Sequence, residues 1–382
     1  MAPFISRFLC GACQNQGQFM SSIATAFTNG QPFSATVTLD SLFKPIVEQL
    51  EQTQELYNET VLATTERNYL QNLLSGESGS FIPAEFRVPV ADRIANHLLQ
   101  SQGKWIRAAL VLLSAGACGV KTQSVRQVAV AVELIHLATL VHDDIIDEAP
   151  MRRGLPSIPA NWGNSIAVLM GDFLFSKAFK LLLASESIPS QTLLTRATGQ
   201  MCLGEIKQLY NSQTENPREQ EYLEMIENKT ASLMSAATAS GAHLGELDKN
   251  NVERFHTYGH AVGMTFQITD DVLDYTASTN ILGKERGGDL RNGKITLPLI
   301  HLFQHDSAVK NMIHSSASLE DKSDYIFRLM TKTGSFEYAY SVGRRYSEQA
   351  HESLNELEKS VGYSDCLHSL HNLIDFILAR QR

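Results

Sequence analysis

Apolar residues recur at helical spacing along most of this chain. Leu42, Ile46 and Leu50 open the pattern, and a polar stretch containing glycines and prolines, from 66 to 89, precedes the next segments. Alternating apolar and polar runs of the strand type are almost absent. We predict helices over 105–120, 125–141, 164–183, 193–210, 219–244, 251–274 and 335–361. The pattern predicts an all-α fold of about ten helices in one large bundle.

The first 39 residues differ from the rest of the chain. They carry one charged residue, Arg7, and are rich in Ser, Thr, Gly and Gln. They lack the basic start and the continuous apolar core of a signal peptide. The best apolar run, 108–120, is too short to span a bilayer. We therefore expect a disordered tail over 1–39 and one helical domain over 40–382, since no linker or repeat divides the remainder.

Composition excludes one class of partner. The 382 residues include 41 acidic and 32 basic side chains, which give a net charge of −9. A nucleic-acid binder needs a positive surface to displace counterions, so this class is excluded. The five cysteines are odd in number and mostly isolated, which favours a reducing, cytoplasmic compartment. Cys10 and Cys13 form a C-x-x-C pair, but no second Cys or His pair follows to complete a zinc site.

Two acidic motifs each follow an apolar helical run. The first is Asp143-Asp144-Ile145-Ile146-Asp147, and the second is Asp270-Asp271-Val272-Leu273-Asp274. In each motif the first and last aspartates are four residues apart and share one helical face. Like charges inside an apolar bundle are unfavourable unless a cation offsets them. A solvated helix end could explain one such motif, but two copies favour a metal site.

Magnesium fits these motifs better than other metals. Clusters of carboxylates suit Mg²⁺, which prefers carboxylate, water and phosphate oxygens. A di-iron bundle is the alternative, because Glu-x-x-His occurs at Glu133 to His136 and at Glu253 to His256. That site would leave both acidic motifs without a role. Zinc would need more His or Cys near the acids.

Basic residues near the first motif indicate an anion site. Arg152 and Arg153 follow it in a predicted tight turn, and paired arginines can grip phosphate oxygens. Lys104 and Arg107 stand at the start of an apolar helix, where the helix dipole favours an anion. His136 lies two turns before the acidic motif on the same face. It is either a satisfied core histidine or part of the site, and its alignment favours the site.

More polar residues surround the second motif. Lys229 and Thr230 open an apolar helix stretch, and Gln267 precedes the motif by one turn. A glycine-rich stretch carrying Lys284 and Lys294 follows it. That stretch nearly satisfies the P-loop spacing, but it lacks the required Ser or Thr after the second lysine and follows a helix. A mobile lid over a diphosphate is the better interpretation.

Together these segments resemble the trans-polyprenyl diphosphate synthases. HDDIIDEAPMRRGLPSIPANWGNSIAVLMGDFLFSKAF is similar to that family's first aspartate-rich region, and FQITDDVLD and GKERGGDLRNGKITLP to its second motif and lysine loop. The similarity covers roughly 90–382. It implies an isoprenoid synthase fold, an all-α bundle around a central active-site cavity, and a homodimer.

The resemblance implies roles for individual residues. Magnesium, as about two or three ions that Mn²⁺ could replace, would be bound by Asp143, Asp147 and Asp270, with Asp144, Asp271 and Asp274 in support. The allylic diphosphate would be held by Arg152, Lys229, Thr230, Gln267, Lys284 and Lys294. Isopentenyl diphosphate would be held by Lys104, Arg107, His136 and Arg153. The catalytic residues would be Asp143, Asp147, Asp270 and Lys229.

The implied reaction joins isopentenyl diphosphate to farnesyl or geranylgeranyl diphosphate, head to tail. The allylic diphosphate leaves, and the double bond of isopentenyl diphosphate attacks the cation. At most, peripheral membrane contact would serve product release. A terpene cyclase would not need the second diphosphate site. A non-catalytic subunit of a heteromeric synthase would show degraded acidic motifs, whereas both are intact.

Two positions bear on substrate binding and product length. Many family members have arginine where this chain has Trp105, although Lys104 and Arg107 remain. One turn before the first motif stand Ala138 and Thr139, both small. Because small side chains leave a pocket open beneath the site, we expect a long product of about six or more isoprene units. A short-chain product, farnesyl or geranylgeranyl, is the alternative. The floor of the pocket could be formed by Leu194, Phe173 or Phe175.

Overall fold

The computed structural model describes residues 37–62, 89–100, 103–211, 218–276, 287–306, 309 and 319–379. Helices dominate these residues, and the strands within them are β1 (Met151–Arg152) and β2 (Leu155–Pro156), which pair as one antiparallel hairpin. The all-α prediction is therefore confirmed. The predicted tail and the polar stretch after the first helices lie almost wholly outside the described residues, as does Lys284.

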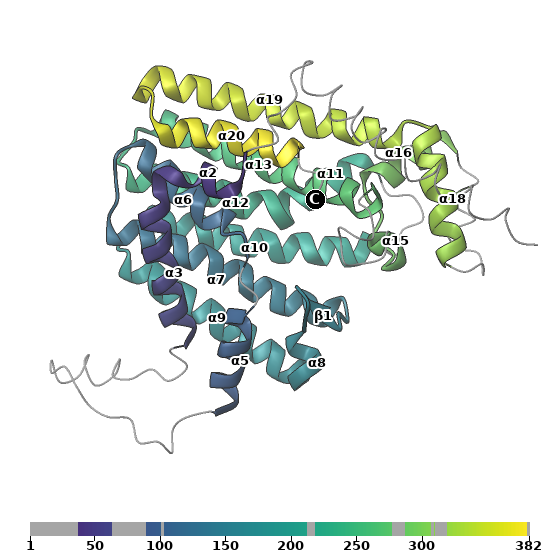
Figure 1. Ribbon diagram of the computed structural model, residues 1–382, viewed down its shortest axis with the longest axis horizontal. Coiled ribbons are helices and arrows are strands. Elements are labelled where there is room, and N and C mark those ends of the chain that lie inside the picture. Colours follow the sequence, from purple (N-terminus) through teal and green to yellow (C-terminus); the bar gives the residue numbers. More distant parts are fainter. Residues whose placement is uncertain are drawn as a thin grey trace, which may run out of the picture.

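The long helices stack side by side in one bundle (Figure 1). Its middle holds α6 (Ile106–Ala117), α7 (Gln123–Ile146), α10 (Ile188–Asn211), α12 (Ser232–Leu244) and α13 (Lys249–Thr276). One side carries α19 (Ser335–Val361) and α20 (Asp365–Ala379), with α2 (Leu39–Leu42) and η1 (Lys44–Ile46) against α20. The opposite side carries α3 (Val47–Leu62), α5 (Pro89–Gln100), α8 (Ile158–Trp162) and α9 (Asn164–Ala184). One end is formed by α11 (Glu219–Ile226), α15 (Gly288–Arg291), α16 (Leu297–His305) and α18 (Leu319–Lys332).

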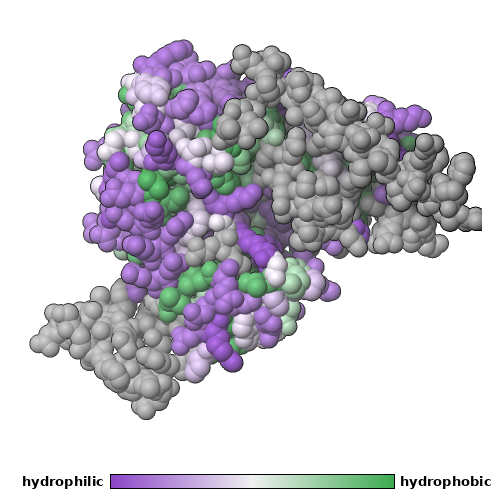
Figure 2. Space-filling view, viewed as in Figure 1, coloured by the Kyte–Doolittle hydropathy of each residue, from purple (hydrophilic) through white to green (hydrophobic). Residues whose placement is uncertain are grey.

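Helix α12 lies at the centre of the bundle, in contact with α6, α7, α10 and α13. All its residues from 232 to 242 are buried, and most of them are Ala, Ser, Thr or Gly. Small side chains let the surrounding helices come close enough to bury their larger apolar residues. In the view of Figure 2 the described surface is mainly hydrophilic, with smaller hydrophobic patches. The apolar pattern of the sequence is thus largely buried in the bundle.

Several predicted helices have limits that differ from those expected, and two of the differences bear on the site. The segment predicted as 125–141 continues as α7 to Ile146, so the first acidic motif forms the end of this helix, with Asp147 as its C-cap. Thr122 caps its start by accepting a hydrogen bond from the backbone N–H of Val125. The segment predicted as one helix over 219–244 is three elements: α11, the π-helix η3 (Glu227–Ala231) and α12. Single π-turns within helices are rare and occur often at functional sites.

Helix α7 is also the one described helix that is long and apolar enough to cross a bilayer. In its most apolar window, 56% of the residues are buried against other parts of the protein. Burial of this extent identifies α7 as a core helix of the bundle.

Glycine allows α13 to approach the π-helix. A Cβ atom added at Gly263 would lie 2.4 Å from the Cα of Ala231. We expect Gly263→Ala to reduce the free energy of unfolding by about 1–3 kcal/mol, because backbone cannot yield as a side chain can. Gly343→Ala is the matched control on α19, since its Cβ would meet Ile268 at 3.5 Å, an ordinary contact. Urea unfolding should show destabilisation only in the first variant.

Candidate active site

The two acidic motifs meet at one cavity. Asp143 lies in the last turn of α7, and Asp270 lies near the end of α13. Both side chains line a cavity of about 440 Å³. A second cavity of about 350 Å³ adjoins it and is lined by Asp147 and Asp271. Lys229 and Gln267 line both cavities. The structure therefore brings together the two clusters that the sequence singled out.

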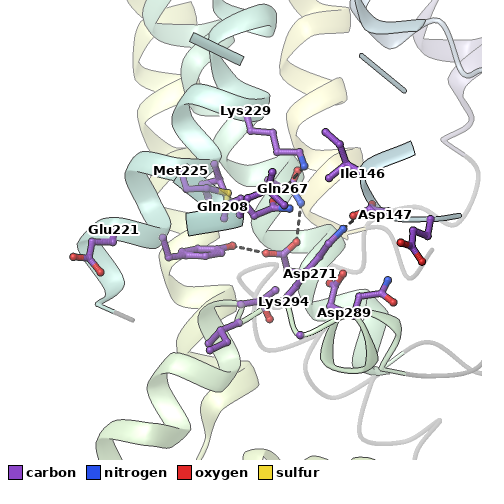
Figure 3. A pocket seen from close by; sticks show the side chains of 18 residues that line it. Ile146, Asp147, Gln208, Glu221, Met225, Lys229, Gln267, Asp271, Asp289 and Lys294 are labelled. Atoms are coloured by element: carbon purple, nitrogen blue, oxygen red, sulfur yellow. Dashed lines mark hydrogen bonds and ion pairs between the residues drawn. The ribbon is translucent and has the colours of Figure 1, made fainter. Parts of the chain in front are cut away.

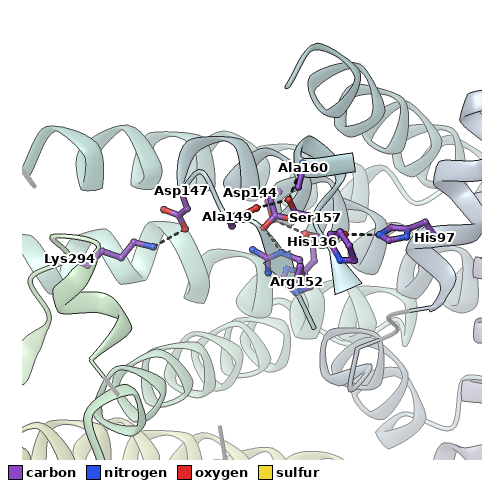
Figure 4. Close-up of polar contacts among 11 residues, drawn as sticks. His97, His136, Asp144, Asp147, Ala149, Arg152, Ser157, Ala160 and Lys294 are labelled. Carbon is purple, nitrogen blue, oxygen red and sulfur yellow. Dashed lines mark hydrogen bonds and ion pairs between the residues drawn. The ribbon is translucent and has the colours of Figure 1, made fainter. Parts of the chain in front are cut away.

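The second aspartate of each motif is buried and hydrogen-bonded. Asp144 accepts a hydrogen bond from Nε of Arg152 at 2.6 Å (Figure 4). Asp271 accepts one from the hydroxyl of Tyr222 and one from Nε2 of Gln267, both at 2.7 Å. These contacts leave the first aspartate of each motif as the one that lines the larger cavity. Each motif thus has one carboxylate that faces the larger cavity and one that is buried and hydrogen-bonded, and of the buried pair Asp271 also lines the second cavity.

Cationic side chains border the acidic cluster. Lys294 donates a hydrogen bond to Asp147 at 2.9 Å (Figure 4). Lys229, in the π-helix, forms an ion pair with Glu205 and donates to Oε1 of Gln208 at 3.2 Å. Thr230, also in the π-helix, donates to Oε1 of Gln267 at 2.7 Å. Figure 3 shows the side chains of Lys229, Gln267 and Lys294 gathered around the cavity with Asp147 and Asp271.

Burial makes these carboxylates hard to ionise without a cation. Burial raises the pKa of Asp143 to about 6, although nearby Lys229 opposes the shift. Burial also raises the pKa of Asp271 well above its usual range, with Asp289 adding to it. The pKa of Asp289 itself is raised to about 7, by burial and then by Asp274. Crowded, poorly solvated carboxylates of this kind are stabilised by a divalent cation.

The donor set fits magnesium held partly by substrate. No three His, Cys, Asp or Glu side chains within the described ranges converge closely enough to hold an ion by themselves. Magnesium commonly takes one or two carboxylates and completes its shell with water and phosphate oxygens. The same observation excludes the di-iron alternative among these residues, since Glu253 is exposed and Glu133 accepts a hydrogen bond from the backbone N–H of Ala108.

Asp289 was missed by the sequence reasoning. It lines the cavity of about 350 Å³, and its backbone N–H donates to the carboxylate of Asp274 at 3.0 Å. Its position between Lys284 and Lys294 in the glycine-rich stretch is a signal that the sequence offers. Glu205 and Tyr222 were also missed. They reach the site from α10 and α11, and no sequence motif marks them.

A second group of basic residues surrounds a third cavity, called the small cavity below. It is lined by His136, Arg153, Trp105 and Tyr57. The β1–β2 hairpin places the arginines, because Arg153 and Gly154 both have positive φ, as a tight two-residue turn requires. Arg152 thereby faces the first acidic motif. Arg153 faces Gly103, where an added Cβ would lie 2.9 Å from the guanidinium.

Arg107 has an unused hydrogen-bonding atom. Its side chain lines the larger cavity, and its Nε is buried with no hydrogen-bond partner among the described residues. Burial lowers the pKa of this arginine, and the adjacent carboxylate of Glu133 opposes the shift. A buried donor without a partner is uncommon and points to a ligand atom. Lys104 is exposed at the start of α6, one turn away.

His136 joins the two regions, because it lines both the small cavity and the larger one. Burial lowers the pKa of His136 well below its usual range, and the neighbouring Arg107 and Arg153 lower it further. The imidazole is therefore neutral at physiological pH. It can donate one hydrogen bond to an anion, but it adds no charge.

Trp105 stands where the family resemblance implies an arginine. It is a non-glycine residue with φ of 57°, immediately before α6. Its ring is buried and meets the edge of Tyr57 with ring centroids 4.8 Å apart. The substitution therefore replaces a cation with an aromatic wall of the small cavity.

The residues expected to form the pocket beneath the first motif lie in different surroundings. Thr139 lines the larger cavity, but Ala138 is fully buried in the hydrophobic core and lines none of the described cavities. Leu194 is likewise a core residue, and Phe173 packs against the core. Phe175 does line the cavity. Other apolar side chains that line it are Leu140, Ile146, Met201, Ile206, Leu209 and Leu233.

The chain is similar to known prenyl diphosphate synthases. Residues 88–330 match the family model described as polyprenyl synthetase. The chain is 36% identical over 296 residues to the geranylgeranyl diphosphate synthase of Methanosarcina mazei, covering 76% of this chain and 89% of the relative. It is 37% identical over 265 residues to heptaprenyl diphosphate synthase component 2 of Geobacillus stearothermophilus, covering 69% and 82%.

Solved structures agree with this assignment. The fold matches the crystal structure of a polyprenyl synthase from Caulobacter crescentus, complexed with calcium and isoprenyl diphosphate. The TM-score is 0.78 at 28% identity, covering 90% of this chain and 98% of that one. The resemblance noted from the motifs is confirmed, and the acidic motifs lie within the matched region. The chain is a prenyltransferase and belongs to the polyprenyl synthetase family.

Proposed function

We propose that the protein condenses isopentenyl diphosphate with an allylic diphosphate, head to tail, and that it makes a long all-trans product. The observation that carries this proposal is that an acidic region and a basic region meet at His136. The two adjoining acidic cavities hold the acidic motifs with Lys229 and Lys294, the small cavity beside Trp105 holds Arg153, and His136 lines both this small cavity and the larger acidic one. A terpene cyclase would need the first region alone. Two anion-binding regions that meet at one residue suit two diphosphate substrates.

The proposed roles follow from where the side chains lie. Asp143, Asp147 and Asp270 would hold Mg²⁺, which when bound supplies positive charge to the leaving diphosphate. Lys229 and Lys294 line the smaller of the two acidic cavities and would hold the same diphosphate. Lys284 keeps this proposed role, although it lies outside the described residues. The apolar lining of the larger cavity would exclude water from the allylic cation.

The second substrate would lie on the other side of His136. Arg107 and Arg153 would bind the diphosphate of isopentenyl diphosphate with Lys104, and the neutral His136 would donate a hydrogen bond. The double bond would then point toward the carbon that loses its diphosphate. The proton lost after bond formation would pass to an oxygen of the departed diphosphate.

Product analysis tests the proposal. The purified chain is incubated with Mg²⁺, labelled isopentenyl diphosphate and farnesyl diphosphate, and the products are sized. We expect elongation to a long chain, and no release of diphosphate from farnesyl diphosphate alone. Release of diphosphate and a hydrocarbon without isopentenyl diphosphate would favour a cyclase. No reaction by the chain alone would contradict a self-sufficient synthase.

We also propose that the protein is cytoplasmic and forms a homodimer. Leu203, Ile206 and Tyr210 lie on one face of α10 and are between 62% and 71% exposed. Leu169 and Leu183 of the neighbouring α9 are similarly exposed. Apolar surface of this kind is commonly covered by another protein, and a second copy is the simplest partner. Light scattering should give twice the mass of the chain, and a monomer would contradict the proposal.

A further inference from the structure

Asp271 is held by a chain of buried and partly buried hydrogen bonds that crosses three elements. Thr230 of the π-helix donates to Oε1 of Gln267, and Nε2 of Gln267 donates to Oδ1 of Asp271. The hydroxyl of Tyr222, in α11, donates to the other carboxylate oxygen, Oδ2. Each of these three distances is 2.7 Å. Both oxygens of Asp271 are therefore occupied from opposite sides.

The end of α13 needs such support. The second motif falls in the last two turns of this helix, which ends at Thr276. Backbone carbonyls at a helix end lack partners within the helix, and opening begins there most easily. Asp271 is only 5% exposed, so its carboxylate has little contact with water. A buried carboxylate in this setting depends on its donors.

Tyr222 is held by packing as well as by its hydrogen bond to Asp271. It is 3% exposed, and it belongs to the same hydrophobic cluster as Val272 and Tyr275 of α13. The start of its helix is held to α19, since the hydroxyl of Tyr338 donates to both oxygens of Glu219 at 2.9 and 2.8 Å. The position of the Tyr222 hydroxyl is thus set by packing, and the carboxylate adjusts to it.

We propose that Tyr222 is a positioning residue for the second acidic motif, acting through Asp271 to set how the last turns of α13 present Asp270 to the cavity. Asp270 and Asp271 are adjacent on the helix, so anchoring the carboxylate of Asp271 holds the helical turn that carries Asp270. The proposal rests on the metal-binding role proposed above for Asp270. Residues that orient metal ligands in this way commonly change metal affinity when they are mutated.

Tyr222→Phe tests the proposal, because it keeps the buried ring and removes one donor to a buried carboxylate. We expect the Mg²⁺ concentration for half-maximal rate to rise about 10- to 100-fold. The KM for isopentenyl diphosphate should stay within about twofold of the wild-type value, because that substrate's proposed residues lie beyond His136. An unchanged Mg²⁺ dependence in the folded variant would overturn the proposal.

Tyr258→Phe is the matched control. Tyr258 is buried on α13, the helix that carries the second motif. Its hydroxyl donates to the backbone carbonyl of Leu370 at 2.8 Å, away from the motif. This variant should lose stability and keep the wild-type Mg²⁺ dependence. An equal shift of Mg²⁺ dependence in both variants would mean general destabilisation and would also overturn the proposal.

A measurement without turnover separates this inference from the proposed function. Calorimetric titration of Mg²⁺ in the presence of inorganic diphosphate reports metal affinity in inactive variants as well. In an Asp271→Asn background, Tyr222→Phe should weaken binding by no more than about twofold further, because the two residues act as one unit. A full, additive loss would contradict action through Asp271. Failure of the wild-type protein to elongate any substrate would instead refute the proposed function.

Discussion

Asp143→Asn is expected to retain the fold and to lose at least about a thousandfold in turnover, because charge stabilisation of the leaving group is a dominant part of such catalysis. The change keeps the shape of the side chain and removes its charge. Asp143 lines the larger cavity, and burial raises its pKa to about 6. Without Mg²⁺, the ionised form of this carboxylate is therefore unfavourable. The variant should therefore melt no lower than the wild type in the absence of Mg²⁺.

Two measurements check this result. Steady-state rates with saturating Mg²⁺ and both substrates give the loss of turnover, and thermal melts with and without Mg²⁺ and inorganic diphosphate give the loss of binding. Asp172→Asn on α9 is the control, because its carboxylate is 64% exposed and lines neither cavity. It should behave as the wild type. Wild-type turnover in Asp143→Asn would refute the metal assignment.

The helical fold was predictable because most of its helices have one apolar face. The limits of α19 match those predicted, and those of α13 extend by two residues at each end. The break of 219–244 at the π-helix was not predictable, because residues 230–242 are buried on all sides and so show no single apolar face whose phase could shift. The short hairpin was indicated only as a tight turn, through Gly154 and its neighbours.

The site likewise contains residues that could be predicted from the sequence and residues that could not. Residues within a motif, such as Asp143 and Asp147, could be identified because their spacing on one helix is a local property. The residues around them could not be identified. Tyr222, which donates to Asp271, and Glu205, which pairs with Lys229, reach the site by tertiary packing alone. The sequence also did not distinguish the cavity-facing aspartate of each motif from the buried one. That distinction depends on which neighbour supplies a donor, Arg152 or Tyr222.

The difference between Ala138 and Thr139 could have been anticipated from helix geometry. His136, Thr139, Leu140 and Asp143 follow the spacing of one helical face, and all four line the larger cavity. Ala138 falls outside that spacing and is fully buried. The two neighbours are both small, but successive helical residues point in different directions, so only one of them can face the cavity.

Product length should therefore respond to Thr139 and not to Ala138. We expect Thr139→Phe to shorten the main product to about four isoprene units or fewer, because an aromatic ring one turn below Asp143 would fill the path of the growing chain. The rate of the first condensation should remain near that of the wild type. Chromatography of labelled products at fixed substrate ratio measures both quantities.

Ala138→Phe separates a blocked path from a damaged core. Overpacking the core at this fully buried position should lower the free energy of unfolding by about 1–3 kcal/mol. The product of any folded protein should keep its wild-type length, since the new ring would face the core. Shortening by Ala138→Phe and none by Thr139→Phe would reverse the assignment of the two residues. Unchanged length in both variants would mean that the chain grows along another wall, with Phe175 the next position to substitute.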